Sequence, residues 1–324
     1  MRQAALTSID EIEPLHDGRV LREGEVPDGV DVAILGMPYG DPYRPEEARN
    51  DQTRAPREIR RAIARPVRAS AHYDFDVGGP VLGEDGEVSL VDFGDVLADP
   101  NDPRGHYRHG EAAMRQILAS GALPVVLGGD HGITTPILRA YDGYGEITVV
   151  QIDAHIDWRD EVNGVREGYS SPMRRASEMA HVRDIVQIGM RSQGSARPQD
   201  VADALAYGAQ IITAYELHDV GIAKVLERIP SGARYYISID ADGLDPSCMP
   251  AVAAPAPGGV TFVQTRQLIH GLVARGRVVG MDLVEIQPSF DVNAISCVTA
   301  GRLMLNLIGS AVRAGYFEGR VARR

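Results

Sequence analysis

The sequence predicts an α/β fold in which helices cover both faces of a mainly parallel sheet of roughly eight strands. Short runs rich in Val and Ile are apolar on both faces, as parallel strands buried between helices are. Stretches of helical periodicity separate these runs from near residue 31 onward, which predicts a doubly wound α/β arrangement. The expected strands are Asp31–Leu35, Ser89–Phe93, Leu123–Leu127, Ile147–Ile152, Asp184–Ile188, Gln210–Thr213, Tyr235–Ile239 and Val278–Val284.

Helices are expected between these strands. The clearest one spans Val263–Arg275, because Thr261 and Gln264 have the spacing of a capping box at its start and one of its faces is apolar. The other stretches of helical periodicity are Pro56–Ala64, Gly110–Ala119, Thr135–Tyr141, Cys297–Val312 and the segment that contains Ile222, Leu226 and Ile229.

Length and composition limit the class of protein. The 324 residues contain no Ser/Gly linker and no internal repeat, so we expect one domain over residues 1–324, with residues 1–30 as an N-terminal extension. The net charge of −12 argues against nucleic acids and anionic membranes as partners and is compatible with a cationic small molecule or metal ions. Cys248 and Cys297 cannot form a disulfide framework, which favours a reducing cytoplasm. No targeting segment or membrane-spanning run is expected.

Three of the expected strands end in clustered side chains that can bind metals. The motif GGDHG follows the third strand, DAHID follows the fourth and DAD follows the seventh. Residues at positions i and i+2 of an extended segment point to the same side, so DAHID and DAD can each direct their side chains to one point, while GGDHG presents His131. In open parallel sheets, ligands bind beyond the carboxyl ends of the strands. The candidate metal ligands are His131, Asp153, His155, Asp157, Asp240 and Asp242.

This set of four carboxylates and two imidazoles carries too much negative charge to gather without cations. Its donor types favour Mn²⁺, with Ni²⁺ and Zn²⁺ left open. The number of ligands suits two divalent ions that share bridging carboxylates, and such a pair lowers the pKa of a shared water. A single Asp after a strand is usually a turn residue or a helix cap. Three such motifs at three strand ends argue for a site.

In this order and spacing, GGDH, DAHID and SIDADGLDP resemble the ureohydrolases, the family of arginase and agmatinase. The resemblance covers most of the chain and includes GMPY near the first strand, IGMR after the fifth and DLVEIQP at the eighth. It implies a three-layer α/β/α fold, a trimer or hexamer, and a binuclear metal site that usually contains Mn²⁺. It also implies hydrolysis of a guanidino C–N bond by a metal-activated hydroxide.

The resemblance assigns a role to each motif residue. Besides binding a metal, Asp157 would orient the attacking hydroxide. Glu285 matches the carboxylate that binds the guanidinium. Chemistry alone allows the same role for Glu285, because a carboxylate accepts two hydrogen bonds from the planar guanidinium fork; a solvated Glu at a strand end is the alternative. The two implied metal sites are His131, Asp153, Asp157 and Asp240, and Asp153, His155, Asp240 and Asp242, with Asp153 and Asp240 bridging.

Two aromatic residues near the motifs are further site candidates, and one of them departs from the family pattern. Tyr169 lies where the family commonly has a proton-handling histidine, and with an ordinary pKa of about 10 it is a poor proton carrier near neutrality. Tyr169 is a catalytic and substrate-binding candidate, with core packing as its alternative. Trp158, next to Asp157, is a candidate to stack on a cationic substrate, and its alternative is also simple packing.

These observations lead to several functional hypotheses. The carboxylate with which arginases hold the α-amino group is not evident after Arg191, which disfavours arginine as substrate. The leading hypothesis is an agmatinase-like amidinohydrolase that releases urea and an amine. Trp158, Tyr169 and the loop Tyr39–Arg57 together suggest a reshaped pocket. Such a pocket also fits a guanidino acid, or a compact guanidine or biguanide; for the compact substrates nickel is the alternative metal. The remaining hypotheses are a non-catalytic subunit of a hetero-oligomer and a single-metal deacetylase.

Overall fold

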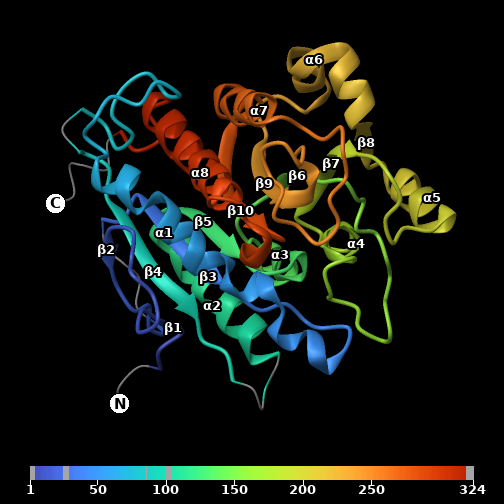
Figure 1. The fold of residues 1–324 in the computed structure, drawn as a ribbon, viewed down its shortest axis with the longest axis horizontal. Coiled ribbons are helices and arrows are strands. Elements are labelled where there is room, and N and C mark those ends of the chain that lie inside the picture. The colour runs from blue at the N-terminus through green and yellow to red at the C-terminus, as the bar shows by residue number, and fades with distance from the viewer. Residues whose placement is uncertain (1–3, 25–28, 85, 100–101, 103, 319–324) are drawn as a thin grey trace.

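A computed structural model describes residues 4–24, 29–84, 86–99, 102 and 104–318 (Figure 1). Its described residues form one sheet in the order β1-β4-β3-β5-β10-β9-β6-β7-β8, with β2 paired to β4. Every pair is parallel except β1 with β4. The strands are β1 (Thr7–Ser8), β2 (Asp17–Gly18), β3 (Val32–Met37), β4 (Leu90–Val96), β5 (Leu123–Gly128), β6 (Ile147–Ile152), β7 (Val182–Met190), β8 (Gln210–Thr213), β9 (Arg234–Asp240) and β10 (Arg277–Val284).

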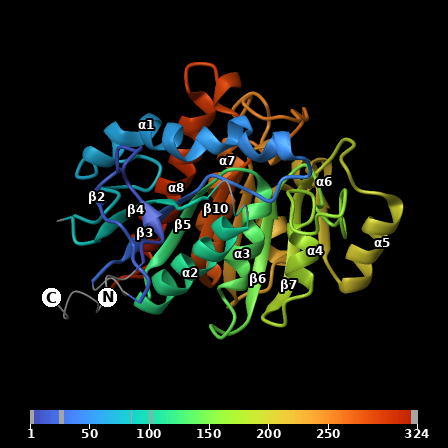
Figure 2. The same cartoon turned by 90° about the horizontal axis from the view of Figure 1, so that it is seen from below.

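Helices cover both faces of this sheet, which confirms the predicted three-layer fold (Figure 2). One layer contains α1, α6, α7 and α8, and the other contains α2, α3, α4 and α5. The helices are α1 (Ala55–Arg68), α2 (Gly105–Ser120), α3 (Thr134–Arg139), α4 (Pro172–Ser177), α5 (Pro198–Tyr207), α6 (Ala214–Arg228), α7 (Phe262–Arg275) and α8 (Ile295–Arg313). Short 3₁₀ helices are η1 (Pro45–Arg49), η2 (Asp51–Arg54), η3 (His131–Ile133), η4 (Ala241–Gly243) and η5 (Pro288–Phe290).

The core consists of two apolar clusters, one on each face of the sheet. Alternate residues of β3 belong to different clusters, Val32 and Ile34 to one and Ala33 and Leu35 to the other. This alternation follows from the two-residue period of a strand. Because helices bury both faces, all six residues of β3 are buried, and the strand is apolar throughout.

The capping box predicted in front of α7 is present. The Thr261 hydroxyl oxygen accepts a hydrogen bond from the Gln264 backbone N–H at 3.2 Å, and the Gln264 amide oxygen accepts one from the Thr261 backbone N–H at 3.0 Å. These two bonds satisfy N–H groups that the first turn of a helix leaves without partners. The start of α7 is thus fixed by local sequence.

Helix α8 is long and apolar. Among the described residues it is the one helix whose length and composition would also suit a membrane span. However, 72% of its apolar window is buried inside the protein, where the helix packs against α1 and α7. Its composition is therefore explained by its place in the core.

The strand order determines where a site can form. Strands β5, β10, β9 and β6 are neighbours in the middle of the sheet and run parallel to one another. Their carboxyl ends therefore lie at one edge of the sheet, and the loops that carry the three motifs emerge there. Residues that are far apart in sequence are brought together at this edge.

Candidate metal centre

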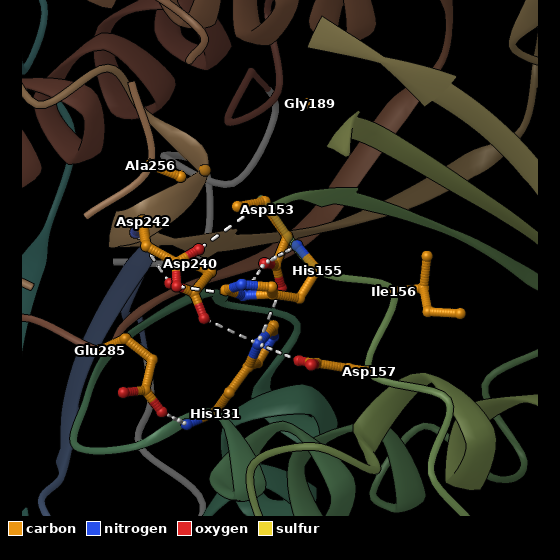
Figure 3. A network of polar contacts seen from close by, with 12 residues as sticks. His131, Asp153, His155, Ile156, Asp157, Gly189, Asp240, Asp242, Ala256 and Glu285 are labelled. Atoms are coloured by element: carbon orange, nitrogen blue, oxygen red, sulfur yellow. Dashed lines mark hydrogen bonds and ion pairs between the residues drawn. The ribbon is translucent and has the colours of Figure 1, made fainter. Parts of the chain in front are cut away.

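The six predicted metal ligands lie together at the carboxyl ends of β5, β6 and β9 (Figure 3). Their ligand atoms form two groups, and within each group all atoms lie within 4.8 Å of one another. The first group consists of buried residues only. The two groups are His131, Asp153, Asp157 and Asp240, and Asp153, His155 and Asp242.

His131 is the centre of the first group. Its Nδ1 atom lies 2.8 Å from a carboxylate oxygen of Asp157, 3.1 Å from one of Asp240 and 3.3 Å from one of Asp153. This nitrogen is buried and makes no hydrogen bond of acceptable geometry. A nitrogen lone pair that faces three carboxylates is stable when a cation lies between them, so the arrangement fits a metal ion.

The other ring nitrogen of His131 determines which nitrogen carries the proton. Nε2 lies 2.9 Å from the Ser238 hydroxyl oxygen. That hydroxyl donates a hydrogen bond to Asp282 Oδ1 at 2.7 Å. Ser238 must therefore accept a hydrogen bond from Nε2–H, which leaves the lone pair on Nδ1. Such outer hydrogen bonds orient the histidine ligands of metal sites.

The second group shares Asp153 with the first. His155 Nδ1 lies 3.2 Å from Asp242 Oδ2 and 3.5 Å from Asp153 Oδ1. Asp240, predicted to bridge both sites, belongs only to the first group here, and its Oδ1 atom accepts the Asp242 backbone N–H at 2.8 Å. The bridging role of Asp240 stays a prediction.

Buried amide side chains hold Asp153 in place. The Gln151 amide nitrogen donates to Asp153 Oδ2 at 2.5 Å, and the Gln187 amide nitrogen donates to the Gln151 amide oxygen at 2.6 Å. All three side chains are fully buried on β6, β7 and the adjoining loop. Because these amides are neutral, they hold the Asp153 carboxylate without cancelling its negative charge, which remains available to a cation. These partners carry no recognisable motif, and sequence analysis did not find them.

The backbone near the ligands has special conformations. Asp157 has a left-handed φ of +46°, which turns its side chain toward His131 rather than along the strand direction. A Cβ atom at Gly243 would lie 2.5 Å from the Asp153 backbone nitrogen, so only glycine permits the approach of these two loops.

Arg191 ties the second group to the rest of the structure. Its buried guanidinium donates to five backbone carbonyls, and no carboxylate contacts it among the described residues. One of these acceptors belongs to the ligand Asp242, at 2.7 Å. The full set of acceptors is Gly189, Asp242, Gly243, Leu244 and Ala256.

The gathered carboxylates repel one another. Burial, together with the neighbouring charges of Asp242 and Asp153, raises the pKa of Asp240 well above its ordinary value. Burial and the charge of Asp153 raise the pKa of Asp157 to about 7. These directions express the cost of burying several negative charges without cations. The donor set therefore fits two divalent ions, as does its mix of carboxylate oxygens and imidazoles.

Glu285 follows β10 and lies beside this centre. It is 9% exposed, has a left-handed φ of +68°, and its backbone N–H donates to the Gly129 carbonyl at 2.8 Å. One carboxylate oxygen accepts the His131 backbone N–H at 2.7 Å (Figure 3). The other accepts the Gln52 amide nitrogen at 3.0 Å. Glu285 is thus a charged acceptor next to the metal ligands, where the sequence predicted a guanidinium-binding residue.

Tyr169 is 38% exposed and lies near enough to Glu285 for that carboxylate's charge to act on its hydroxyl. Its ring packs 4.5 Å from the ring of Tyr43, centroid to centroid. Burial, followed by the charge of Glu47 and then by Tyr43 and Glu285, raises the pKa of Tyr169 to about 12. This placement of Tyr169 is compatible with the predicted position beside the substrate. The catalytic role of Tyr169 stays a prediction.

The structure contradicts the stacking role of Trp158. This side chain is only 1% exposed and packs against Tyr207 in the core on one face of the sheet. The left-handed turn at Asp157 directs the ligand to the centre, whereas the following residue enters the core. Trp158 offers no ring face to a bound substrate, and we correct this part of the expected site.

The chain is similar to known proteins over most of its length. Residues 30–309 match the model of the Arginase family. The chain is 32% identical to a guanidinopropionase and 31% identical to a guanidinobutyrase, both of Pseudomonas aeruginosa; each match covers 87% of this chain, and 87% and 86% of the relatives. The crystal structure of the agmatine ureohydrolase of Thermoplasma volcanium is similar with a TM-score of 0.75 and 26% identity, over 96% of this chain and 98% of that chain.

Proposed function

Because this chain belongs to the arginase family, we propose that it is an agmatinase-like amidinohydrolase that releases urea and an amine from a cationic guanidino substrate. Hydrolysis of a C–N bond in a guanidino compound is the reaction class of the family and of its relatives. One observation carries the assignment to this site: the buried carboxylate of Glu285 lies beside two adjoining groups of metal-type ligands.

We assign the metals as follows. His131, Asp153, Asp157 and Asp240 would hold one divalent ion, and Asp153, His155 and Asp242 the other. Asp240 would complete the second set as a bridging ligand, as the family pattern implies. Mn²⁺ is the first choice for this donor set and Ni²⁺ the alternative. When bound, the two ions supply the acidity that makes water a nucleophile near neutral pH.

The protein's own residues then position the reactants. Glu285 binds the guanidinium and fixes its plane through charged hydrogen bonds. Asp157 orients the attacking water. With its raised pKa, the Tyr169 hydroxyl stays protonated at neutral pH and acts as a hydrogen-bond donor. Holding the reactants in this geometry supplies much of the rate enhancement.

Glu47 supports a substrate with a second positive charge. It is near enough to Tyr169 for its charge to raise the pKa of that residue. Its Oε1 atom lies 3.9 Å from the exposed guanidinium of Arg44, whereas its Oε2 atom is buried without a hydrogen-bond partner. A carboxylate here would attract the terminal amine of agmatine and repel the carboxylate of a guanidino acid. We therefore place agmatine before guanidinobutyrate and guanidinopropionate.

A substrate panel tests this proposal. Agmatine, guanidinobutyrate, guanidinopropionate, guanidine, a biguanide and arginine are assayed with Mn²⁺ and separately with Ni²⁺, and released urea and amine are measured. Agmatine with Mn²⁺ is expected to give the highest kcat/KM. Preferred turnover of guanidine or a biguanide with Ni²⁺ would replace the substrate assignment. No turnover of any compound would favour the non-catalytic subunit.

The metal assignment is tested by Asp153→Asn. Because Asp153 is shared by both ligand groups, we expect loss of bound metal and a fall in activity of more than about 100-fold. Metal content is measured by elemental analysis of the purified protein. Asp160→Asn is the matched control, since Asp160 is exposed and pairs with Arg175. A fully active, metal-loaded Asp153→Asn variant would refute the site.

A further inference from the structure

We propose that Gln52 is a substrate-binding residue that determines the preference for guanidinium over simple ammonium groups. This inference rests on the proposed function, because it concerns the guanidinium that Glu285 binds. Gln52 lies on η2, in the long loop that follows β3, and is 6% exposed. Its position in the sequence is 233 residues from Glu285, yet the two side chains are hydrogen-bonded at 3.0 Å.

The chemistry of this contact orients the Gln52 amide. A carboxylate only accepts hydrogen bonds, so the amide nitrogen must face Glu285 Oε2 and the amide oxygen must lie on the other side. That oxygen, Gln52 Oε1, is buried and has no hydrogen-bond partner. A buried acceptor without a donor is costly, and in a native structure such an atom calls for an explanation.

A guanidinium at Glu285 provides the missing donor. Both carboxylate oxygens of Glu285 already accept one hydrogen bond from the protein, from the His131 backbone and from Gln52, and each has one lone pair left. A guanidinium presents several N–H groups in one plane. Its fork can occupy the free lone pairs of Glu285 while a neighbouring N–H reaches the adjacent Oε1 of Gln52.

The loop that carries Gln52 is fixed relative to Glu285. The carboxylate of Asp51, also on η2, accepts the Ser289 backbone N–H at 2.7 Å. Ser289 lies on η5, four residues after Glu285. The amide of Gln52 is also neutral, so it holds Glu285 without neutralising the negative charge that a cationic substrate needs. An Arg or Lys at this position would occupy the carboxylate instead.

The test compares two ligands on the metal-loaded protein. Guanidinium chloride and methylammonium chloride are titrated by calorimetry or as competitive inhibitors against wild type and Gln52→Met. Met has a similar size but can neither donate to Glu285 nor accept from the ligand. We expect guanidinium to bind at least about tenfold more weakly to the variant than to wild type. Methylammonium offers no planar fork, so its affinity should fall by no more than about threefold.

Gln116→Met on α2 is the matched control, because Gln116 also has a buried amide oxygen without a partner but lies away from the ligand groups. It should leave both affinities unchanged. Equal weakening of the two ligands in Gln52→Met would show that Gln52 only supports Glu285, and unchanged affinities would exclude any role; either result overturns the proposal. Metal content and melting temperature of each variant exclude misfolding. Failure of the substrate panel in wild type would instead refute the proposed function, independently of these affinities.

Discussion

Tyr169 retains its proton at every pH at which the enzyme would be assayed. Burial and the charge of Glu47 raise its pKa to about 12, so fewer than about one molecule in a thousand is ionised at pH 8. A side chain that does not release its proton cannot shuttle one between solvent and substrate. We therefore expect the leaving amine to take its proton from another group or from water, and Tyr169 to contribute only a hydrogen bond and its ring.

The variant Tyr169→Phe separates these contributions. It removes the hydroxyl and keeps the ring that packs on Tyr43, so we expect kcat/KM to fall by no more than about tenfold, the typical effect of one hydrogen bond. The pH–rate profile between pH 6 and 10 should keep its shape. Loss of one limb of that profile in Tyr169→Phe would assign proton transfer to this residue after all.

Single residues differ in how far the sequence reveals them. Five of the six candidate metal ligands were predictable because they lie two residues apart at strand ends, and His131 because it ends a third strand in the same way. Glu285 was predictable because a carboxylate matches the guanidinium. The role of Gln52 was not predictable, since a neutral amide in a long loop gives no signal of its own. Its proposed role follows only from its contact with Glu285, 233 residues away. The position of Trp158 depended on the left-handed turn at Asp157, which the sequence does not encode visibly.

The segment that follows β3 is anchored by a buried histidine on α2. The Tyr39 backbone N–H donates to His106 Nε2 at 3.3 Å, and His106 Nδ1 lies 3.3 Å from the Leu97 carbonyl. His106 is 1% exposed, its ring meets the Tyr39 ring edge to face, and His109 contacts the same carbonyl. Burial first, and the neighbouring His109 charge as well, lower the pKa of His106 to about 4.

This depressed pKa makes stability depend on pH. Between pH 6.5 and about 4 the unfolded chain protonates His106 while the folded protein does not, so stability falls as pH decreases through this window. At pH 5 the loss from this residue is about 2 kcal/mol. Urea unfolding at pH 7.5 and 5.0 measures it. In His106→Gln the free energy of unfolding should fall by about 2 kcal/mol less between pH 7.5 and 5.0 than in wild type. An equal fall in the two proteins would show that groups other than His106 cause the pH dependence.

The elements with long apolar patterns were predicted, and the shortest were not. All eight expected strands are present, two of them with the expected bounds, β6 and β8. Strands β1 and β2 contain two residues each, too few for any periodicity. Helices α4 and α5 were also not expected. Helix α1 continues through Pro66 to Arg68, although a proline inside a helix removes one hydrogen bond.

At the scale of the whole molecule, part of the net charge of −12 is concentrated at one point. Four carboxylate ligands and Glu285 lie at the carboxyl edge of the sheet. Cations bound there would therefore contribute to the stability of the entire fold and not only to the chemistry. The cytoplasmic location, the single domain and the trimeric or hexameric assembly stay predictions.

Metal removal should consequently destabilise the protein. At free metal 100-fold above the Kd, binding to the folded state adds about 2.7 kcal/mol to the free energy of unfolding. Calorimetric scans with Mn²⁺ and with a chelator should show a lower melting temperature for the chelated protein. In Asp153→Asn, which removes the shared ligand, the two scans should nearly coincide. A melting temperature of wild type that does not respond to chelation would contradict this account.

The strand order also has a consequence for synthesis on the ribosome. Strand β10 is the last strand in the chain, yet it lies in the middle of the sheet, paired with β5 on one side and β9 on the other. The strands made earlier form two separate halves, and no pairing between described strands joins these halves directly. A nascent chain can therefore assemble each half but cannot unite them, or place Glu285 beside His131, until residues 277–285 have emerged. The complete site, with Glu285 beside His131, can therefore form only in the last stage of folding.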